Sequence, residues 1–256
     1  MSPLVIDRIV RETFVVEVEH HIEITSTNDR AVQRAKQGAN KLPLMVIADR
    51  QTAGRGRGSN RWWTGSGSLA FSLLFDSKTI DTNNGSMPLV SLTAGLAVVE
   101  TIKPLLPNHE VGINWPNDVV AGGHKLAGIL VEVLPGQKTI IGIGINTNNA
   151  MADAPAELLP IATTLLDLTG AEHDHTAILV SLLSRLERHL VTLKQDPPQV
   201  AAQADALCLQ RGKNLTLQTG SQSVTGVCSG IAPDGALLLE TAYGLRTFYS
   251  GVVVLS

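Results

Sequence analysis

The sequence predicts a mixed α+β protein in two parts, a large region over residues 1–205 and a small all-β module over residues 206–256. One reason is that apolar, strand-like runs are interspersed with helix-like segments through most of the chain. A second is the change of pattern near residue 211, after which short apolar runs follow each other at close spacing. A third is the composition, since 44% hydrophobic and 17% charged residues are ordinary for a globular protein with a sizeable core.

The N-terminal quarter of the chain predicts strands on both sides of a helix. Ser26, Thr27 or Asn28 can cap the helix, and Gly38 is its expected end. The next strand runs directly into a loop rich in glycine and arginine, after which another strand resumes. The expected strands are FVVEVE (14–19), LPLMVIADRQT (42–52) and SLAFSLLF (68–75).

The middle of the chain predicts a long helix followed by a strand meander. An Asp/Asn/Gly-rich loop over residues 76–86 precedes the apolar helix 87–106, which should end near Pro104. Residues 111–148 then contain three apolar runs. Gly122-Gly123, a hairpin signal, and Pro135-Gly136 separate them.

The C-terminal third predicts a helix and then the small β module. HTAILVSLLSRLERHLVTLKQ (175–195) is the helix, and DPPQ (196–199) is expected to begin a connection without regular structure. Asp234-Gly235 is one of several turn signals between the short strands, whose close spacing favours a barrel. The expected strands are NLTLQT, QSVTGVCSGI, ALLLET, LRTFYS and VVVL.

Composition argues against nucleic-acid and membrane partners. A net charge of −3 gives no overall cationic field, so the positive charge around the arginine loop is local. Charged residues interrupt every apolar window of the N-terminus, and no uncharged apolar run reaches about 18 residues, so neither a signal peptide nor a membrane span is expected. The two cysteines, Cys208 and Cys228, are expected to be reduced thiols in a cytoplasmic protein.

The loop TAGRGRGSNRWW (52–63) is the first candidate for chemistry. Glycine loses more conformational freedom on folding than any other residue, and neighbouring arginines repel, so such a run needs an anionic partner to order it. Guanidinium groups bind phosphate or carboxylate bidentately, which makes a small-anion site one interpretation. A solvated hairpin tip or an RGG-like nucleic-acid segment are the alternatives. The chain lacks a P-loop, and a strand rather than a helix should follow this loop, which argues against a dinucleotide fingerprint.

Two further segments carry polar groups next to apolar strands. NWPNDVV begins at Asn114 and interrupts a strand with polar side chains, which fits either a site or a simple Pro-Asn-Asp turn. Lys125 opens an apolar strand and can place its ammonium at a site, although a lone lysine is more often just exposed. Asn146 ends IIGIGIN, where closely spaced glycines permit another chain or a ligand near the strand.

Taken in order, these segments resemble the biotin protein ligases (biotin–[acetyl-CoA-carboxylase] ligases). STND, QTAGRGRGSNRWW, NWPND, KLAGILVEV and GIGINTN occur in the family's order and spacing, and the likeness extends to the terminal β module. The resemblance implies a class II synthetase-like catalytic domain followed by a small SH3-like β barrel. It also implies a two-step reaction, in which biotin and ATP give biotinyl-5′-AMP before a carrier lysine takes the biotin. Biotin and ATP are then the substrates, with Mg²⁺ as the accompanying ion and no metal site on the protein.

The resemblance assigns roles residue by residue. It makes Arg57 and Lys125 catalytic and places Asn146 beside the nucleotide, which Arg57 and Lys125 also contact. Trp62 is expected to pack beside the ligand. The biotin-binding residues that it implies are Ser26, Thr27, Asn28, Gln51, Arg55, Gly56 and Arg57.

One residue departs from the family pattern. The family usually reads KWPND, and Asn114 stands here in place of that lysine, which removes one positive charge from the reacting centre. A lipoate or octanoate ligase or transferase of the same fold, or a non-catalytic ligand-binding homologue, is the alternative function. The implied partner is a biotin carboxyl carrier protein or domain, and a homodimer is compatible with the family. About twenty-five residues precede STND, too few for the DNA-binding domain that some members carry, so no nucleic-acid partner is expected.

Overall fold

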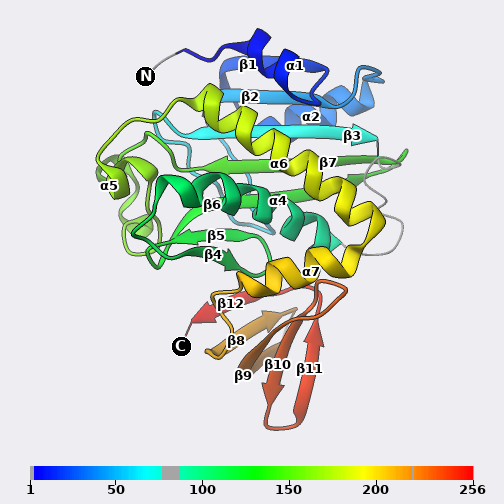
Figure 1. The fold of residues 1–256 in the computed structure, drawn as a ribbon, viewed down its shortest axis with the longest axis vertical. Helices are drawn as coiled ribbons and strands as arrows, with labels where there is room; N and C mark the ends of the chain where they lie inside the picture. The colour runs from blue at the N-terminus through cyan, green and yellow to red at the C-terminus, as the bar shows by residue number, and fades with distance from the viewer. Residues whose placement is uncertain (1–2, 77–86, 221, 256) are drawn as a thin grey trace.

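The computed structural model describes residues 3–76, 87–220 and 222–255, which form a large and a small β-sheet with helices packed on the large one (Figure 1). The predicted loop over residues 76–86 lies, from residue 77 on, outside the described residues. The mixed α+β class predicted from the sequence is confirmed.

The large sheet has seven strands in the order β1-β2-β3-β7-β6-β5-β4. β1 and β2 are parallel and every other neighbouring pair is antiparallel. β3, β7 and the first five residues of β2 are almost wholly buried, which explains why these stretches are continuous apolar runs rather than alternating ones. The strands are β1 (Glu17–Ile24), β2 (Leu44–Gln51), β3 (Leu69–Asp76), β4 (Val111–Asn114), β5 (Asp118–Ala121), β6 (His124–Leu134) and β7 (Lys138–Ile145).

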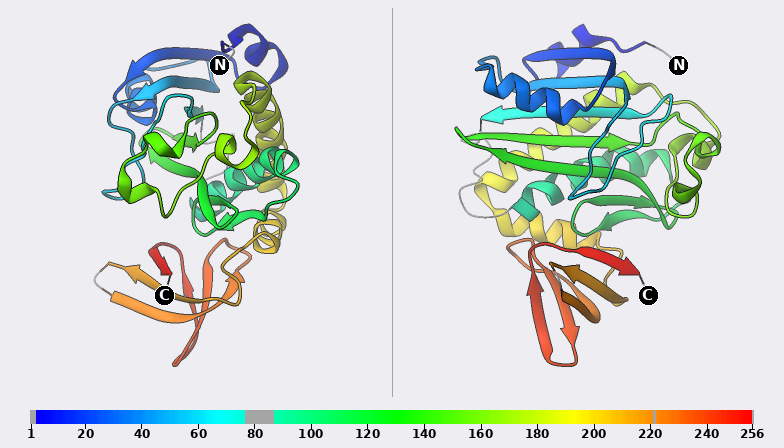
Figure 2. Two further views of the ribbon diagram at one scale, coloured as in Figure 1. Left: turned by 90° about the vertical axis from the view of Figure 1, so that its left-hand side faces the viewer. Right: turned by 180° about the vertical axis from the view of Figure 1, so that it is seen from behind.

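Helices cover both faces of this sheet. α4 (Met87–Ile102), α6 (His175–Gln195) and α7 (Pro197–Ala206) lie across one face, and the view from behind shows α2 (Thr27–Lys36) on the other (Figure 2). Two apolar cores result, a large one under α4 and α6 and a small one under α2. By length and composition the segment Met87–Leu105, at a mean hydropathy of 1.3, could cross a membrane, but 78% of it is buried inside the protein. The segment is therefore a core helix. α4 ends at Ile102 and is followed by a 3-10 turn over Lys103–Leu105, which contains Pro104, the predicted end of the helix.

Several elements differ from the sequence expectation. DPPQ does not begin an irregular connection, because the Asp196 carboxylate accepts a hydrogen bond from Gln199 N–H (3.2 Å) and caps α7. Prolines suit the first turn of that helix, where an N–H would be unpaired anyway. The first strand lies later than FVVEVE, since β1 also takes in His20–Ile24. The short helices α1 (Ile6–Glu12) and α5 (Leu165–Thr169) were not predicted.

The small sheet is antiparallel, with five strands in the order β11-β10-β9-β8-β12. It lies at the end of the large sheet that carries β4 and β5 (Figure 1). α7 ends at Ala206 and β8 begins at Asn214, and a division of the chain after residue 205 stays a prediction. The strands are β8 (Asn214–Thr219), β9 (Gln222–Ile231), β10 (Leu237–Thr241), β11 (Gly244–Phe248) and β12 (Val252–Leu255).

Candidate active site

A pocket of about 220 Å³ opens between the large sheet, the arginine loop and the C-terminal strand. Its floor is the central part of β6 and β7, where Gly128, Gly142 and Gly144 leave room above the backbone. The start of α2, the turn between β4 and β5, and β12 supply the walls. Segments far apart in the sequence therefore meet at one cavity.

The N-terminus of α2 is held rigidly at one wall. Ser26 caps the helix, its Oγ accepting a bond from Asp29 N–H (3.4 Å). The N–H and the hydroxyl of Thr27 both donate to Gln51 Oε1, at 2.8 and 3.1 Å. Gln51 Nε2 in turn donates to Thr64 Oγ1 (3.2 Å), which fixes the orientation of the amide. The end of β2 thus sets the position of the first helical residue.

Asn28 is fixed from three sides. Its Oδ1 accepts a bond from Ser72 Oγ (2.6 Å), and its Nδ2 donates to Glu132 Oε2 (2.7 Å). It also needs the glycine opposite, because a Cβ at Gly142 would lie 2.0 Å from Asn28 Oδ1. Ser26, Thr27 and Asn28 are all buried although they are polar, which indicates a wall built for polar recognition.

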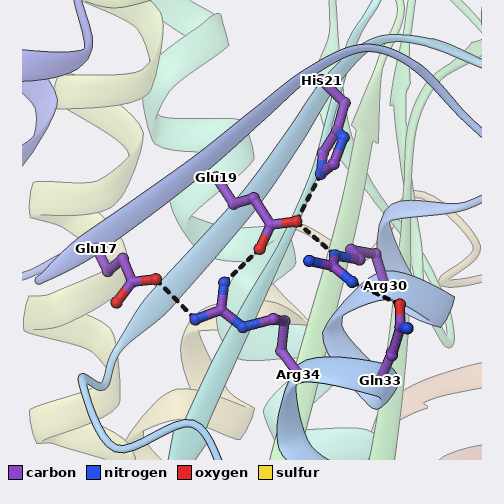
Figure 3. Close-up of polar contacts among 6 residues, drawn as sticks. All are labelled: Glu17, Glu19, His21, Arg30, Gln33 and Arg34. Atoms are coloured by element: carbon purple, nitrogen blue, oxygen red, sulfur yellow. Dashed lines mark hydrogen bonds and ion pairs between the residues drawn. The ribbon is translucent and has the colours of Figure 1, made fainter. Parts of the chain in front are cut away.

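A charged network ties this helix to the edge strand β1 (Figure 3). Glu19 accepts bonds from Arg30 and Arg34 of α2 and lies 2.7 Å from His21 Nε2, while Arg34 also donates to Glu17 (2.7 Å). Burial by itself would raise the pKa of Glu19, but these hydrogen bonds outweigh it and lower the pKa to about 2. The carboxylate therefore stays charged at neutral pH and holds α2 against the sheet.

The arginine loop is a closed hairpin in this structure. Arg55 and Arg61 form an antiparallel bridge, Gly56 N–H donates to Asn60 O (2.8 Å), and Asn60 N–H donates to Arg57 O (3.1 Å). Gly58 has φ +61°, which a glycine adopts without strain. A Cβ at Gly54 would lie 2.5 Å from Trp62 O, so the close approach of the two sides of the hairpin requires glycine there. The strand β3 follows the loop, as predicted.

The arginines of the loop differ in their partners. Arg55 is neutralised by two carboxylates, Asp29 (2.8 Å) and Glu132 (2.6 Å). Arg57 makes no ion pair within the described residues and instead donates to Asn117 Oδ1 (3.4 Å) and to Gly251 O (3.2 Å). Burial lowers the pKa of Arg57, opposed by the charge of Asp118, yet a guanidinium remains protonated at any physiological pH. Arg57 is thus a half-buried cation with capacity for an anion.

Lys125 projects toward the same cavity from β6. Its ammonium lies 2.8 Å from Asp118 Oδ1 as a charge contact, and 5.8 Å from the centroid of the Trp62 ring. The Trp62 indole rests on glycine, since a Cβ at Gly144 would come within 2.3 Å of it. Trp62 Nε1 is buried and finds no hydrogen-bond acceptor in the described part of the chain. A buried N–H without a partner is costly, so this atom favours a ligand acceptor beside it.

The turn between β4 and β5 is anchored to the C-terminal module. Trp115 N–H donates to Gln210 Oε1 (2.8 Å), Gln210 Nε2 donates to Trp115 O (3.3 Å), and the Trp115 indole donates to Gly235 O (2.9 Å). Asn117 is fixed through Nδ2 to Ile129 O (2.9 Å). Asn114 ends β4, pairs with Asp118 and lines the pocket. NWPND is therefore both a turn and a pocket wall, so the two interpretations of it were compatible.

The structure brings most of the predicted site residues to this one cavity. Asn146 is the exception, because it does not line the pocket. Its Nδ2 donates to Thr163 O (3.1 Å), while its Oδ1 is buried and has no partner among the described residues. The predicted residues that line the pocket are Ser26, Thr27, Asn28, Gln51, Arg55, Gly56, Arg57 and Lys125.

Other pocket residues were not predicted as site residues. Asn117 and Asp118 lie within the quoted NWPND segment, which is the signal that could have identified them. Gln210 and Gly251 have no local sequence signal, because they reach the pocket only through the packing of the C-terminal module. Across the described ranges, no group of three or more His, Cys, Asp or Glu side chains is placed to hold a metal ion.

Comparison with known families gives two matches along the chain. The biotin/lipoate A/B protein ligase family matches residues 21–148, and the biotin protein ligase C-terminal domain matches residues 212–256. The first match covers the pocket floor and most of its walls, and the second covers the small sheet, including the wall formed by β12.

Individual relatives agree with these matches. A biotin--[acetyl-CoA-carboxylase] ligase of Mycobacterium tuberculosis is 38% identical over 90% of this chain and 85% of its own length. The bifunctional ligase/repressor BirA of Bacillus subtilis is 33% identical over 92% of this chain and 73% of its own length. Among solved structures, a biotin protein ligase from Aquifex aeolicus in complex with biotin and ATP has a TM-score of 0.82 and 29% identity, covering 94% of this chain and 99% of that one.

Proposed function

Because the chain belongs to the biotin/lipoate A/B protein ligase family, we propose that the pocket under the arginine hairpin is where biotin and ATP react. The activity is that of an ATP-dependent biotin protein ligase, which forms biotinyl-5′-AMP and transfers biotin to a lysine of a carboxylase's biotin carrier. The observation that supports this site best is the unpaired, half-buried cation Arg57 above a floor of glycines.

In this proposal the polar wall of α2 binds biotin. Ser26, Thr27, Asn28 and Gln51 have fixed orientations before any ligand arrives, so binding costs little reorganisation. Gly56 and Arg55 contribute from the hairpin, but two carboxylates already neutralise Arg55. Arg55 is therefore assigned to shaping the biotin wall rather than to holding the reacting anions.

Arg57 and Lys125 hold the nucleotide phosphates. A biotin carboxylate oxygen attacks the α-phosphorus of ATP, the bond to the bridging oxygen breaks, and pyrophosphate leaves with the electron pair. Arg57 stabilises the charge that develops on the phosphoryl oxygens, because its donors are not occupied by a protein carboxylate. Lys125 reaches the same anions by exchanging Asp118 for phosphate.

The second half-reaction uses the same cavity. The carrier lysine attacks the carbonyl carbon of the mixed anhydride, and AMP leaves with the electrons of the broken C–O bond. Closure of the pocket by the hairpin and β12 keeps water from hydrolysing the anhydride first. Trp62 packs beside the ligand, and its unpartnered Nε1–H donates to a ligand oxygen or nitrogen.

Asn146 contributes to the nucleotide side through its Oδ1, which has no partner among the described residues. Mg²⁺ would enter with ATP. Proteins usually bind this ion through substrate phosphates and one or two carboxylates rather than through a site made of protein ligands alone. The protein is expected to act in the cytoplasm. It is also expected to bind no nucleic acid, which a gel-shift measurement would test. Light scattering would show whether it forms a homodimer.

The experiment that tests this function is carrier modification. The protein is incubated with Mg-ATP, a biotin carrier domain and either biotin or lipoate, and the intact mass of the carrier is measured. Addition of one biotinyl group, with no lipoyl group added in the parallel reaction, is the expected result. An unmodified carrier or a lipoylated one would overturn the assignment.

A further inference from the structure

A pair of thiols lies outside the pocket, where the linker after α7 meets the small sheet. Cys208 is in that linker and forms a parallel bridge with Ile113 of β4, and Cys228 is in β9. Both are free and buried, and they lie close enough for each thiol to shift the pKa of the other. Neither side chain lines the pocket assigned to biotin and ATP.

A second cleft of about 480 Å³ gives access to Cys208. Lys103 and Lys213 line it and form no ion pair within the described residues. Arg211 also lines it, paired with Asp205, and Glu110 is the one carboxylate on its wall. The cleft is therefore electropositive around a sulfur atom, the setting in which cysteines become reactive.

We propose that Cys208 is a thiol-modification site that reacts with small anionic disulfides, and that Cys228 resolves the adduct. The Cys208 thiolate attacks one sulfur of the disulfide R–S–S–R, forming Cys208–S–S–R and releasing R–S⁻. Cys228 then loses its proton to the released thiolate and attacks the Cys208 sulfur, which expels the second R–S⁻. The two protein thiols are oxidised to one disulfide, and R–S–S–R is reduced to two thiols.

The two cysteines differ as these roles require. The hydrogen bond from Cys228 and those from the backbone N–H groups of Gln210 and Arg211 lower the pKa of Cys208 to about 7, against burial and the charge of Asp205. The same thiol–thiol bond and burial raise the pKa of Cys228, so it remains protonated. An attacking thiol is most effective when its pKa is near the ambient pH. His109 also lies on the cleft wall.

The test is intact-mass analysis of the folded full-length chain treated with glutathione disulfide. The wild type should lose two hydrogen atoms and regain them with dithiothreitol, at a rate that rises as pH passes about 7. Cys228→Ser should instead accumulate the protein with one glutathione attached, and Cys208→Ser should not react. Thermal unfolding of each variant establishes that it is folded.

Cystamine, a cationic disulfide, tests the role of the basic wall. Lys213→Ala should slow the reaction with glutathione disulfide by roughly two- to fivefold and leave the cystamine rate unchanged or faster. An adduct on Cys208→Ser, or equal slowing with both disulfides, would overturn the proposal. So would an unreactive wild type under conditions in which urea-unfolded protein is oxidised.

Discussion

At the scale of single residues, the site depends on which cations already have a partner. Asp29 and Glu132 neutralise Arg55, and Asp118 is in contact with Lys125. Among the residues that the structure describes, Arg57 has only neutral acceptors. A positive charge that the protein itself does not neutralise is available to an incoming anion without breaking an ion pair. By this criterion Arg57 is more available to an anion than Arg55 or Lys125, a difference that their sequence spacing does not show.

Arg57→Ala is expected to reduce the rate of biotinyl-AMP formation by about 10²–10³, the usual loss when one donor to a developing oxyanion is removed. The melting temperature without ligand should hardly change, because the hairpin contributes little to the core. Single-turnover kinetics and thermal unfolding measure the two effects. Arg50→Ala is the matched control, since Arg50 precedes the same loop but is exposed and pairs with Glu23. A large loss of stability with unchanged adenylation would contradict the assignment.

Asn114→Lys tests whether the missing family lysine is an electrostatic deficit. Asn114 lines the pocket next to Asp118, so a lysine there should speed adenylation or tighten biotin, by roughly 1–3 kcal/mol if the ammonium faces the reacting groups. The new ammonium would also compete with Lys125 for Asp118.

The Lys125→Ala background separates these two effects. If the lysines share one role, Asn114→Lys should restore adenylation to Lys125→Ala in single-turnover kinetics. If adenylation and biotin affinity are unchanged in both backgrounds, then position 114 does not face the reacting atoms.

At the scale of elements, the biotin wall depends on how α2 is fixed to β1. Glu19→Gln removes the charge that Arg30 and Arg34 share, and it should lower the free energy of unfolding by about 1–3 kcal/mol at neutral pH. Since the pKa of Glu19 is lowered in the folded state, this contribution is complete above the ordinary value of 4.5 and is lost as pH falls toward about 2.

Urea unfolding of both proteins across that pH range measures the difference. The gap between wild type and Glu19→Gln should close on acidification, and a gap independent of pH would rule out the charge as its cause. Glu23→Gln is the control on the same strand, because its ion pair with Arg50 is exposed and worth about 0.5 kcal/mol or less.

Gly251, immediately before β12, links the small sheet to Arg57. A methyl group at Gly251 would lie 2.6 Å from Leu217 Cδ1 and 3.0 Å from Gln218 O, so Gly251→Ala should displace the carbonyl that accepts from Arg57. Adenylation should slow by about tenfold, a loss of roughly 1.4 kcal/mol typical of one hydrogen bond to a charged group. Adding Gly251→Ala to Arg57→Ala should cost nothing further.

Gly244→Ala controls for general damage to the small sheet. Gly244 has φ +96° and no neighbour within 4 Å of an added Cβ, so its substitution strains the module without touching the pocket. Equal losses of adenylation in Gly244→Ala and Gly251→Ala, measured by pyrophosphate release, would exclude a specific role for the carbonyl.

Across the whole molecule, local sequence patterns predicted the elements whose position depends on neighbouring residues, namely the buried strands and the start of a helix. Continuous apolar runs identified β2, β3 and β7, and the three cap candidates Ser26, Thr27 and Asn28 marked the start of α2, where the structure has Ser26 as the cap. α7 was missed because its two prolines resemble a break unless the Asp196 cap is recognised. α1 and α5 were also missed, because helices of seven and five residues give too short a pattern to recognise.

The site was predictable only where its residues share a motif. Thr27, Gln51 and Arg57 lie in quoted segments, whereas Gly251 is 194 positions from Arg57 and enters the pocket through packing alone. Asn146 directly follows β7, and its amide is held by Thr163 O, 17 positions further along the chain, rather than by the pocket. Contacts between residues so far apart in the sequence leave no pattern that can be recognised in a single sequence.

We propose that Arg57 acts on biotin and ATP in one pocket formed by both sheets. A rapid-quench measurement of pyrophosphate released from Mg-ATP, with biotin present and the carrier absent, tests it most directly. The wild type should release one pyrophosphate per protein in a burst and retain biotinyl-AMP, while Arg57→Ala should lose the burst although it remains folded. A full burst with retained intermediate in Arg57→Ala, or a wild-type burst that does not require biotin, would contradict the claim.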